Sequence, residues 1–170
     1  MAKVGLFYGS TTGKTADAAE QIQEALGGDS VVDLVDIAES DAGSLSEYEY
    51  LIIGCPTWNI GDLQDDWEAV FEDLDDVDFS GKTVAYFGTG DQVGYGDNFM
   101  DAMGQLEEKI AGLGGKTVGY WPSDGYEHNE SLAIRDGKFC GLALDDDNES
   151  DKSADRIQTW TAQIKSAMAL

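Results

Sequence analysis

Short runs of apolar and β-branched residues recur along the chain, separated by segments with the spacing of amphipathic helices. The runs lie at Val4–Tyr8, Val31–Ile37, Tyr50–Cys55, Thr83–Phe87 and Thr117–Trp121. They do not alternate cleanly with polar residues, which is typical of strands covered on both faces. Helical spacing of apolar residues occurs at Thr15–Leu26, Leu63–Leu74, Phe99–Leu113 and from Ser153 onward. The alternation predicts an α/β fold, doubly wound, with helices on both faces of a parallel sheet.

The fifth strand is expected to be interrupted. After Trp121 a polar stretch, at about residues 122–138, precedes a second apolar run at Phe139–Leu144. An edge strand tolerates such an insertion, whereas a central strand would not. No repeat, linker or low-complexity tract is visible, so residues 1–170 are interpreted as a single domain.

The composition adds a strong charge. The 170 residues include 34 acidic and 10 basic side chains, a formal net charge of -24. Such a surface repels polyanions, which argues against nucleic acid and anionic membranes as partners and favours a basic protein. The acidity is concentrated, because residues 15–81 hold 19 Asp or Glu and no Lys or Arg. This stretch is either a docking face for a basic partner or an adaptation for solubility in salt.

The N-terminus, the cysteines and the histidine bear on localisation and on metal binding. The N-terminus has no long apolar run, so neither a signal peptide nor membrane insertion is expected. Cys55 and Cys140 have neither CxxC nor metal-ligand spacing, and we interpret them as buried thiols within strands. The single histidine, His128, is expected to be solvated in the insertion. A cytoplasmic protein without a metal is the prediction.

Hydroxyl-rich residues follow the first predicted strand and open the first helix. The segment Gly9–Thr15 has two glycines for a tight turn, and a helix N-terminus points its amides outward. This combination suits a phosphate group. Only three residues separate the glycines, where a Walker A loop needs four, so a terminal monophosphate fits better than a nucleoside triphosphate. The predicted phosphate-binding residues are Ser10, Thr11, Thr12, Gly13, Lys14 and Thr15; a helix cap without a ligand remains the alternative.

Two further strand ends carry aromatic residues. Trp58 follows the third strand, and Tyr95 lies in the glycine-rich segment Thr89–Asn98 after the fourth. Two rings on adjacent loops could hold a flat heterocycle between them, and Asp91 could accept a hydrogen bond from a ring N–H. Alternatively, Trp58 folds back on the core. A phosphate cradle beside an aromatic slot describes flavin mononucleotide (FMN), and no complete GxGxxG dinucleotide motif is present.

These motifs, in this order, resemble those of flavodoxins of the long-chain type, found in cyanobacteria and some other bacteria and algae. The resemblance covers essentially the whole chain and includes Tyr8–Thr15, Cys55–Gly61, Gly90–Tyr95, Asp97–Phe99 and Gly141–Asp145. It implies a three-layer, flavodoxin-like sandwich with five parallel strands in the order 2-1-3-4-5 and one noncovalent FMN.

The resemblance also assigns roles to residues. It implies that Ser10 to Thr15 hold the phosphate and that Thr57, Asn59 and Asp147 approach the ribityl chain. Trp58 and Tyr95 would stack on opposite faces of the isoalloxazine ring. Thr89, Gly90, Asp91 and Asn98 would contact the rim of the ring. In the family, the peptide between the residues matching Asn59 and Ile60, just before Gly61, rotates on reduction.

The function predicted in this way is a low-potential one-electron carrier rather than an enzyme. It would shuttle between the semiquinone and hydroquinone of FMN, and acidic groups near the ring would make the last electron harder to add. By resemblance, the partners are basic redox proteins such as a ferredoxin–NADP reductase-like flavoprotein or a photosystem I-type donor. They would dock near Asp62, Asp65, Asp66 and Glu68, and the carrier is expected to be a monomer. The alternative is an FMN-dependent NAD(P)H:quinone reductase on the same fold, although Trp58 and Tyr95 would leave it little room for a second substrate.

Overall fold

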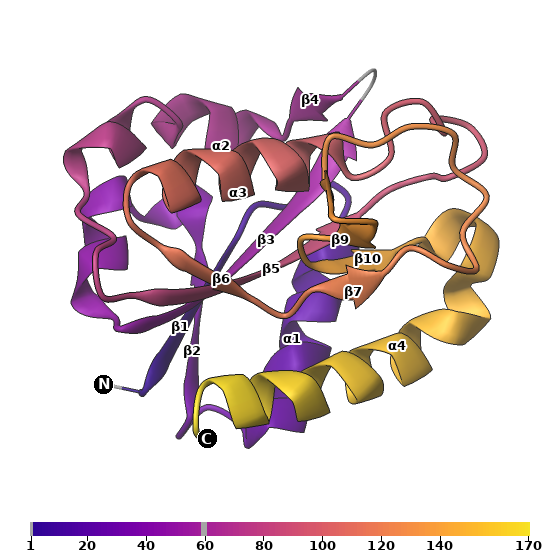
Figure 1. The fold of residues 1–170 in the computed structure, drawn as a ribbon. Coiled ribbons are helices and arrows are strands. Elements are labelled where there is room, and N and C mark those ends of the chain that lie inside the picture. The colour runs from indigo at the N-terminus through magenta and orange to yellow at the C-terminus, as the bar shows by residue number, and fades with distance from the viewer. Residues whose placement is uncertain (1, 59–60) are drawn as a thin grey trace.

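A central sheet, mostly parallel, organises the computed structural model, which describes residues 2–58 and 61–170 (Figure 1). Its hydrogen-bonded strand order is β10-β5-β3-β1-β2. The strands are β1 (Val4–Tyr8), β2 (Val32–Asp36), β3 (Tyr50–Trp58), β5 (Thr83–Thr89) and β10 (Leu142–Leu144). A further strand, β6 (Lys116–Val118), runs parallel to the first half of β5. The predicted order 2-1-3-4-5 is therefore confirmed, with β6 and β10 as the two pieces of the divided fifth strand.

Helices cover both faces of the sheet, as expected for a doubly wound fold (Figure 1). Helices α1 (Lys14–Leu26) and α4 (Asp146–Ala167) pack on one face, where Ile22, Ile52 and Trp160 belong to one buried cluster. Helices α2 (Asp65–Val70) and α3 (Asp101–Gly112) pack on the other face, over a second core that includes Trp67 and Leu106. The central strands are buried on both sides, which explains why their sequences do not alternate.

The segment after β3 differs from the expected helix over Leu63–Leu74. Asp62 and Leu63 form β4 (Asp62–Leu63), which folds back antiparallel to the end of β3. The side chain of Gln64 then accepts hydrogen bonds from the backbone N–H groups of Asp66 (3.1 Å) and Trp67 (3.4 Å). This cap begins α2 at Asp65, because it satisfies first-turn amides that have no partner within the helix. The 3₁₀ turns η1 (Ile37–Glu39), η2 (Ala42–Glu47) and η3 (Asp73–Asp76) complete this half of the chain.

The insertion in the fifth strand has a small sheet of its own. Strands β7 (Trp121–Pro122), β9 (Lys138–Phe139) and β8 (Ile134–Arg135) pair antiparallel in that order. Trp121 and Phe139 are partners in this sheet, so the prediction that they continue the fifth strand is wrong. Phe139 is apolar for another reason: it is fully buried beneath the insertion, 5.2 Å from the ring of Tyr126.

The two cysteines are fully buried, whereas the single histidine is only partly buried. Cys55 and Cys140 are buried thiols, as predicted, and burial raises the pKa of each to about 12. Cys140 lies between β9 and β10, however, and not in a strand. His128 is half-buried in the insertion, so the prediction that it is solvated holds only in part. Its ring centroid is 5.2 Å from that of Phe139 and 5.5 Å from that of Phe99, and burial lowers its pKa.

The insertion packs tightly on helix α3. A Cβ added at Gly104 would come within 2.5 Å of the carbonyl oxygen of Leu132 and 2.8 Å of the backbone nitrogen of Ala133. An ion pair between Arg135 and the buried Glu107, 3.0 Å long, joins the same two elements. Among the described residues, none of the helices has the length and apolar character needed to cross a membrane.

We predict that Gly104→Ala destabilises the fold by about 1–3 kcal/mol, because the added methyl group meets backbone that cannot move aside. Gly112→Ala, in the same helix, is the matched control. A Cβ there meets nothing within 4 Å, so we expect stability to be unchanged or to rise by up to about 1 kcal/mol. Urea unfolding followed by circular dichroism measures both changes. Equal effects of the two substitutions would contradict the close packing of the insertion on α3.

Candidate functional site

The strand order creates a crevice at the carboxyl edge of the sheet. Strands β1 and β3 are neighbours, but the helices that follow them, α1 and α2, lie on opposite faces. The loops after these strands therefore diverge, and ligands of open α/β sheets bind at such a point. A cavity of about 280 Å³ lies here, lined by Thr12, Lys14, Pro56, Thr57, Thr89, Gly90, Asp91, Tyr95, Asp146 and Asp147.

The loop between β1 and α1 presents an open helix N-terminus to this cavity. Gly13 is the N-cap, with a φ of 89° in the left-handed region and no side chain to cap the first-turn amides of α1. Its own N–H donates to Ser10 Oγ at 3.0 Å, which closes the turn. Thr11 and Thr12 are exposed. Uncapped amides, hydroxyls and the positive end of a helix dipole together favour an anion at this place.

Lys14 and Thr15 play different parts in that loop. Lys14 Nζ is hydrogen-bonded and ion-paired with Asp147 Oδ1 on α4, and this bond raises the pKa of the lysine. Thr15 points inward instead: it is 1% exposed, and its hydroxyl lies 3.0 Å from that of Thr89 at the end of β5. The Thr15 side chain therefore ties α1 to β5, which leaves its backbone for any contact with an anion.

The loop after β5 is held in a tight turn by Asp91. Its Oδ1 accepts from the backbone N–H groups of Gly94 (2.7 Å) and Val93 (3.0 Å), as well as from Asn148 Nδ2 (2.8 Å). These bonds, that of Gly94 first, lower the pKa of Asp91. Tyr95 at the tip of the loop is 49% exposed and lines the cavity. A ring that accessible is available to stack on a planar ligand.

The loop after β3 is anchored to α3. Thr57 Oγ1 accepts from the backbone N–H of Ala102 (3.1 Å), and the carbonyl of Gly61 accepts from Gln105 Nε2 (2.7 Å). Gly61 and Asn98 do not line the first cavity; they line a separate one of about 600 Å³. The side chain of Trp58 and residues Asn59 and Ile60 lie outside the described part of the chain. The predicted stacking of Trp58 and the peptide rotation at Asn59–Ile60 therefore stay predictions.

Sequence reasoning missed several residues that shape the site. Pro56 and Asp146 line the cavity, and the buried Gln64 donates to Thr11 Oγ1 (3.3 Å) in the loop between β1 and α1. Gly9 has no room for a Cβ, which would come 2.2 Å from Gln64 Oε1. Glutamine is not a preferred N-cap residue, so nothing in the local sequence marks Gln64. Asp146 directly precedes the predicted site residue Asp147 and could have been included on that ground.

The fold and the crevice define a doubly wound α/β protein of the class that binds phosphate-bearing cofactors at the carboxyl edge of its sheet. Residues 6–160 match the family model described as flavodoxin. The chain is 63% identical to a flavodoxin of Picosynechococcus sp. and 62% identical to one of Synechococcus elongatus, over all of both chains in each case. It superposes on a crystal structure of Fusobacterium nucleatum flavodoxin bound to flavin mononucleotide with a TM-score of 0.92 and 30% identity, covering 98% of this chain and 99% of that one. The chain belongs to the flavodoxin family.

We predict that Thr57→Val destabilises the protein by about 1 kcal/mol, because the Ala102 N–H at the start of α3 loses its acceptor. Thr57→Ser keeps the hydroxyl and should retain most of that energy. Urea unfolding of the flavin-free chain measures the difference. If serine and valine cost the same, the hydroxyl does not hold the β3 loop on α3.

Proposed function

We propose that this flavodoxin binds FMN with the phosphate at residues 10–15 and the isoalloxazine ring between the loops that follow β3 and β5. As a member of its family the chain is an FMN-based electron carrier and not an enzyme, and its relatives do not favour the NAD(P)H:quinone reductase alternative. The observation that carries the binding mode is the single cavity that joins the α1 N-terminus to Tyr95 and Asp91.

The residues present fit this cofactor. The uncapped N-terminus of α1 supplies amide donors, and Lys14 supplies one positive charge near a phosphate. Thr57, Thr89 and Gly90 offer hydroxyl and backbone groups along the cavity, where a polyol chain needs donors and acceptors. The exposed ring of Tyr95 offers an apolar face for a flat heterocycle. The proposed binding set is completed by Ser10, Thr11, Thr12, Gly13, Thr15, Trp58, Asn59, Ile60 and Asp147. It also includes Gly61 and Asn98, which line the separate cavity described above.

FMN, when bound, supplies one-electron oxidation and reduction. The protein's part is to bind the ring, keep water from it and set the electrostatic field around it. Asp91, Asp146 and Asp147 line the cavity and Asp145 is buried next to them, with Lys14 as the cation in the cavity lining. An excess of negative charge opposes the arrival of another electron, so this site favours a low reduction potential.

Asp91 gives a way to separate charge from loop shape. Asp91→Asn removes the carboxylate but keeps an oxygen that can accept from Val93 and Gly94. We predict that it raises the potential of the second reduction by tens of millivolts, up to about 60 mV, with FMN affinity little changed. Asp91→Ala also opens the turn, so it should raise the potential and weaken FMN binding about tenfold. Spectroelectrochemical titration and FMN fluorescence titration measure the two effects.

An unchanged second potential in both variants would contradict the electrostatic role of Asp91. Equal FMN affinities in both would contradict its role in shaping the loop.

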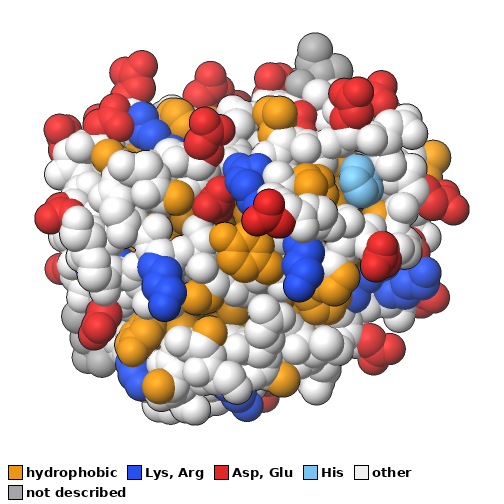
Figure 2. All heavy atoms as spheres, in the orientation of Figure 1, with side chains coloured by type: hydrophobic (Ala, Val, Ile, Leu, Met, Phe, Trp, Pro, Cys, Tyr) orange, Lys and Arg blue, Asp and Glu red, His pale blue; other side chains and the backbone are white. Residues whose placement is uncertain are grey.

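A flavodoxin exchanges electrons with redox proteins, and we infer that the partners of this one are basic and dock around α2. Asp65 and Glu68 are exposed on α2, and with Asp62 they line a hollow of about 520 Å³ that also reaches Thr11 and Gly61 of the site loops. Asp66 of the same helix completes this acidic face. Figure 2 shows acidic side chains along the upper rim of the molecule, whereas Lys and Arg side chains are scattered singly over this face. A basic partner would be attracted by these carboxylates to a surface that lies close to the cofactor site.

The proposed partners are a ferredoxin–NADP reductase-like flavoprotein or a photosystem I-type donor, met by a monomeric carrier. We also propose that the protein is cytoplasmic, in keeping with two thiols that are free and buried in the described structure. The acidity of the surface supports a protein partner over nucleic acid or a membrane.

We predict that Asp65→Asn combined with Glu68→Gln slows electron transfer to a basic ferredoxin–NADP reductase about tenfold at roughly 0.01 M salt. The difference from wild type should shrink at about 0.1 M salt, because the Debye length is shorter there. The matched control is Glu20→Gln with Glu24→Gln, two exposed carboxylates on α1, on the other face of the sheet. Stopped-flow mixing measures the rates. Equal slowing by both pairs would show that net charge matters and the α2 face does not.

A further inference from the structure

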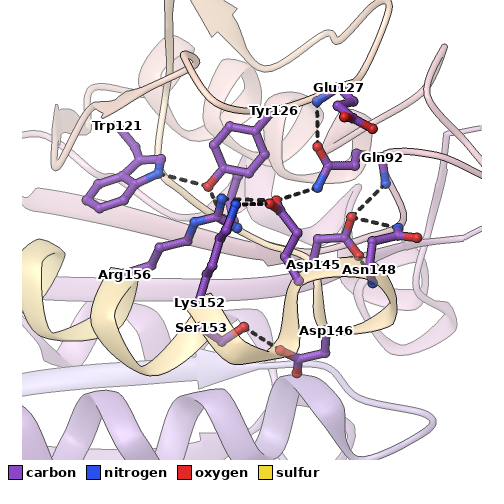
Figure 3. A network of polar contacts seen from close by, with 12 residues as sticks. Gln92, Trp121, Tyr126, Glu127, Asp145, Asp146, Asn148, Lys152, Ser153 and Arg156 are labelled. Carbon is purple, nitrogen blue, oxygen red and sulfur yellow. Dashed lines mark hydrogen bonds and ion pairs between the residues drawn. The ribbon is translucent and has the colours of Figure 1, made fainter.

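A buried glutamine joins three segments that are far apart in the sequence (Figure 3). Gln92 follows Asp91 in the loop after β5 and is 2% exposed. Its backbone N–H donates to Asp145 Oδ2 (3.0 Å), and its side-chain Nε2 donates to Glu149 Oε1 (2.6 Å). Its Oε1 accepts from the backbone N–H of Glu127 in the insertion (2.5 Å). Gln92 is thus bound twice to the start of α4 and once to the insertion.

Glu149 is held as firmly as Gln92. It sits at a break in α4, with φ -136° and ψ 40°, so the first turn of the helix is set apart from the rest. Its carboxylate accepts from Lys152 Nζ (2.6 Å) and Arg156 Nη2 (3.0 Å), in addition to Gln92. These hydrogen bonds, that of Lys152 first, lower the pKa of Glu149 to about 2. The group is therefore ionised, and the stabilisation that it supplies is lost only as pH falls toward that value.

The insertion backs this arrangement from the other side. The guanidinium of Arg156 lies 4.3 Å from the centre of the Tyr126 ring. The hydroxyl of Tyr126 donates to the carbonyl of Ala143 (2.5 Å) and accepts from Trp121 Nε1 (2.9 Å). Figure 3 shows Arg156 beside the ring of Tyr126, with Trp121 on the far side of that ring. Arg156 thus has little freedom to release the carboxylate.

The same helix start also holds Asp91. Asp145 is fully buried and accepts from the backbone N–H and the side chain of Asn148. Asn148 Nδ2 is shared with Asp91 Oδ1 at 2.8 Å. The loop after β5 is therefore fixed to the first turn of α4 at two adjacent residues, Asp91 and Gln92. A buried polar network of this kind favours one arrangement, because any other leaves polar groups without partners.

We propose that Gln92 and Glu149 are positioning residues that hold the loop of residues 91–95 in the conformation that receives the FMN ring. Neither lines the cavity; both act through Asp91 and Tyr95. The proposal rests on the proposed binding mode. FMN binding costs less free energy when the loop is already ordered. If the loop held the binding conformation only about one time in ten, the apparent affinity for FMN would be about tenfold weaker.

The test titrates the flavin-free full chain with FMN and with riboflavin, using the quenching of flavin fluorescence. Gln92→Leu and Glu149→Leu should each raise the Kd about tenfold. The double variant should cost less affinity than the sum of the two single variants, because each single variant already breaks the bond between Gln92 and Glu149. FMN and riboflavin should lose affinity by the same factor, since the phosphate loop is untouched.

Thr117→Val is the control. It removes a 2.7 Å hydrogen bond to the buried Glu107, in a strand beside the first half of β5 and away from the carboxyl edge. We expect it to lower thermal stability and to change either Kd by less than about twofold. If it weakens flavin binding as much as Gln92→Leu does, general destabilisation explains the effect and the proposal is overturned. Folded Leu variants with wild-type Kd values would also overturn it.

A reciprocal exchange covers the case in which a Leu variant does not fold. Gln92→Glu places two carboxylates together and should weaken binding. Adding Glu149→Gln restores an amide–carboxylate bond in the opposite sense and should recover most of the affinity. No recovery would overturn the proposal. If the wild-type chain itself bound no FMN, the proposed binding mode would fail instead, so the two failures are distinguishable.

Discussion

The parallel arrangement of the sheet determines where everything else in this protein lies. Because β1, β3 and β5 run in the same direction, their carboxyl ends meet at one edge. Because the helices after β1 and β3 lie on opposite faces, the loops at that edge separate and leave a crevice. The loop of residues 10–15, the turn at Asp91 and the start of α2 all lie at this edge because of that one constraint.

Electrostatics then gives the crevice its chemical character. An uncapped helix N-terminus attracts an anion at one end, although carboxylates dominate the rest of the lining. The two effects do not conflict, because amide dipoles act over the first turn only, whereas the carboxylates act on the whole cavity. Under the function proposed here, the same acidity on the neighbouring surface would attract a basic partner, and one property of the composition would serve both the reduction potential and docking.

Much of this was visible in the sequence, for identifiable reasons. Strands such as Val4–Tyr8 are buried on both faces, and their apolar runs leave little choice of structure. The loop at residues 10–15 has a local pattern that needs no tertiary information. The prediction that Trp121 and Phe139 continue the fifth strand was wrong, because the apolar character of a residue does not distinguish a strand of the main sheet from one in the small sheet of the insertion.

The remaining site residues depend on contacts between distant segments. Thr15 turns inward because Thr89 is there to receive its hydroxyl, and His128 is partly buried because Phe99 and Phe139 flank it. Gln64 and Gln92 each bind a partner more than fifty residues away in the chain, Thr11 and Glu149 respectively. No local pattern marks them.

The central claim is that this crevice binds one FMN and makes it a low-potential one-electron carrier. The most direct test is a reductive titration of the purified protein in a spectroelectrochemical cell, with the flavin content measured on the same sample. The account predicts one FMN per chain and two well-separated one-electron steps, the second at a potential well below that of free FMN. A chain without flavin, or a single two-electron step at the potential of free FMN, would contradict it.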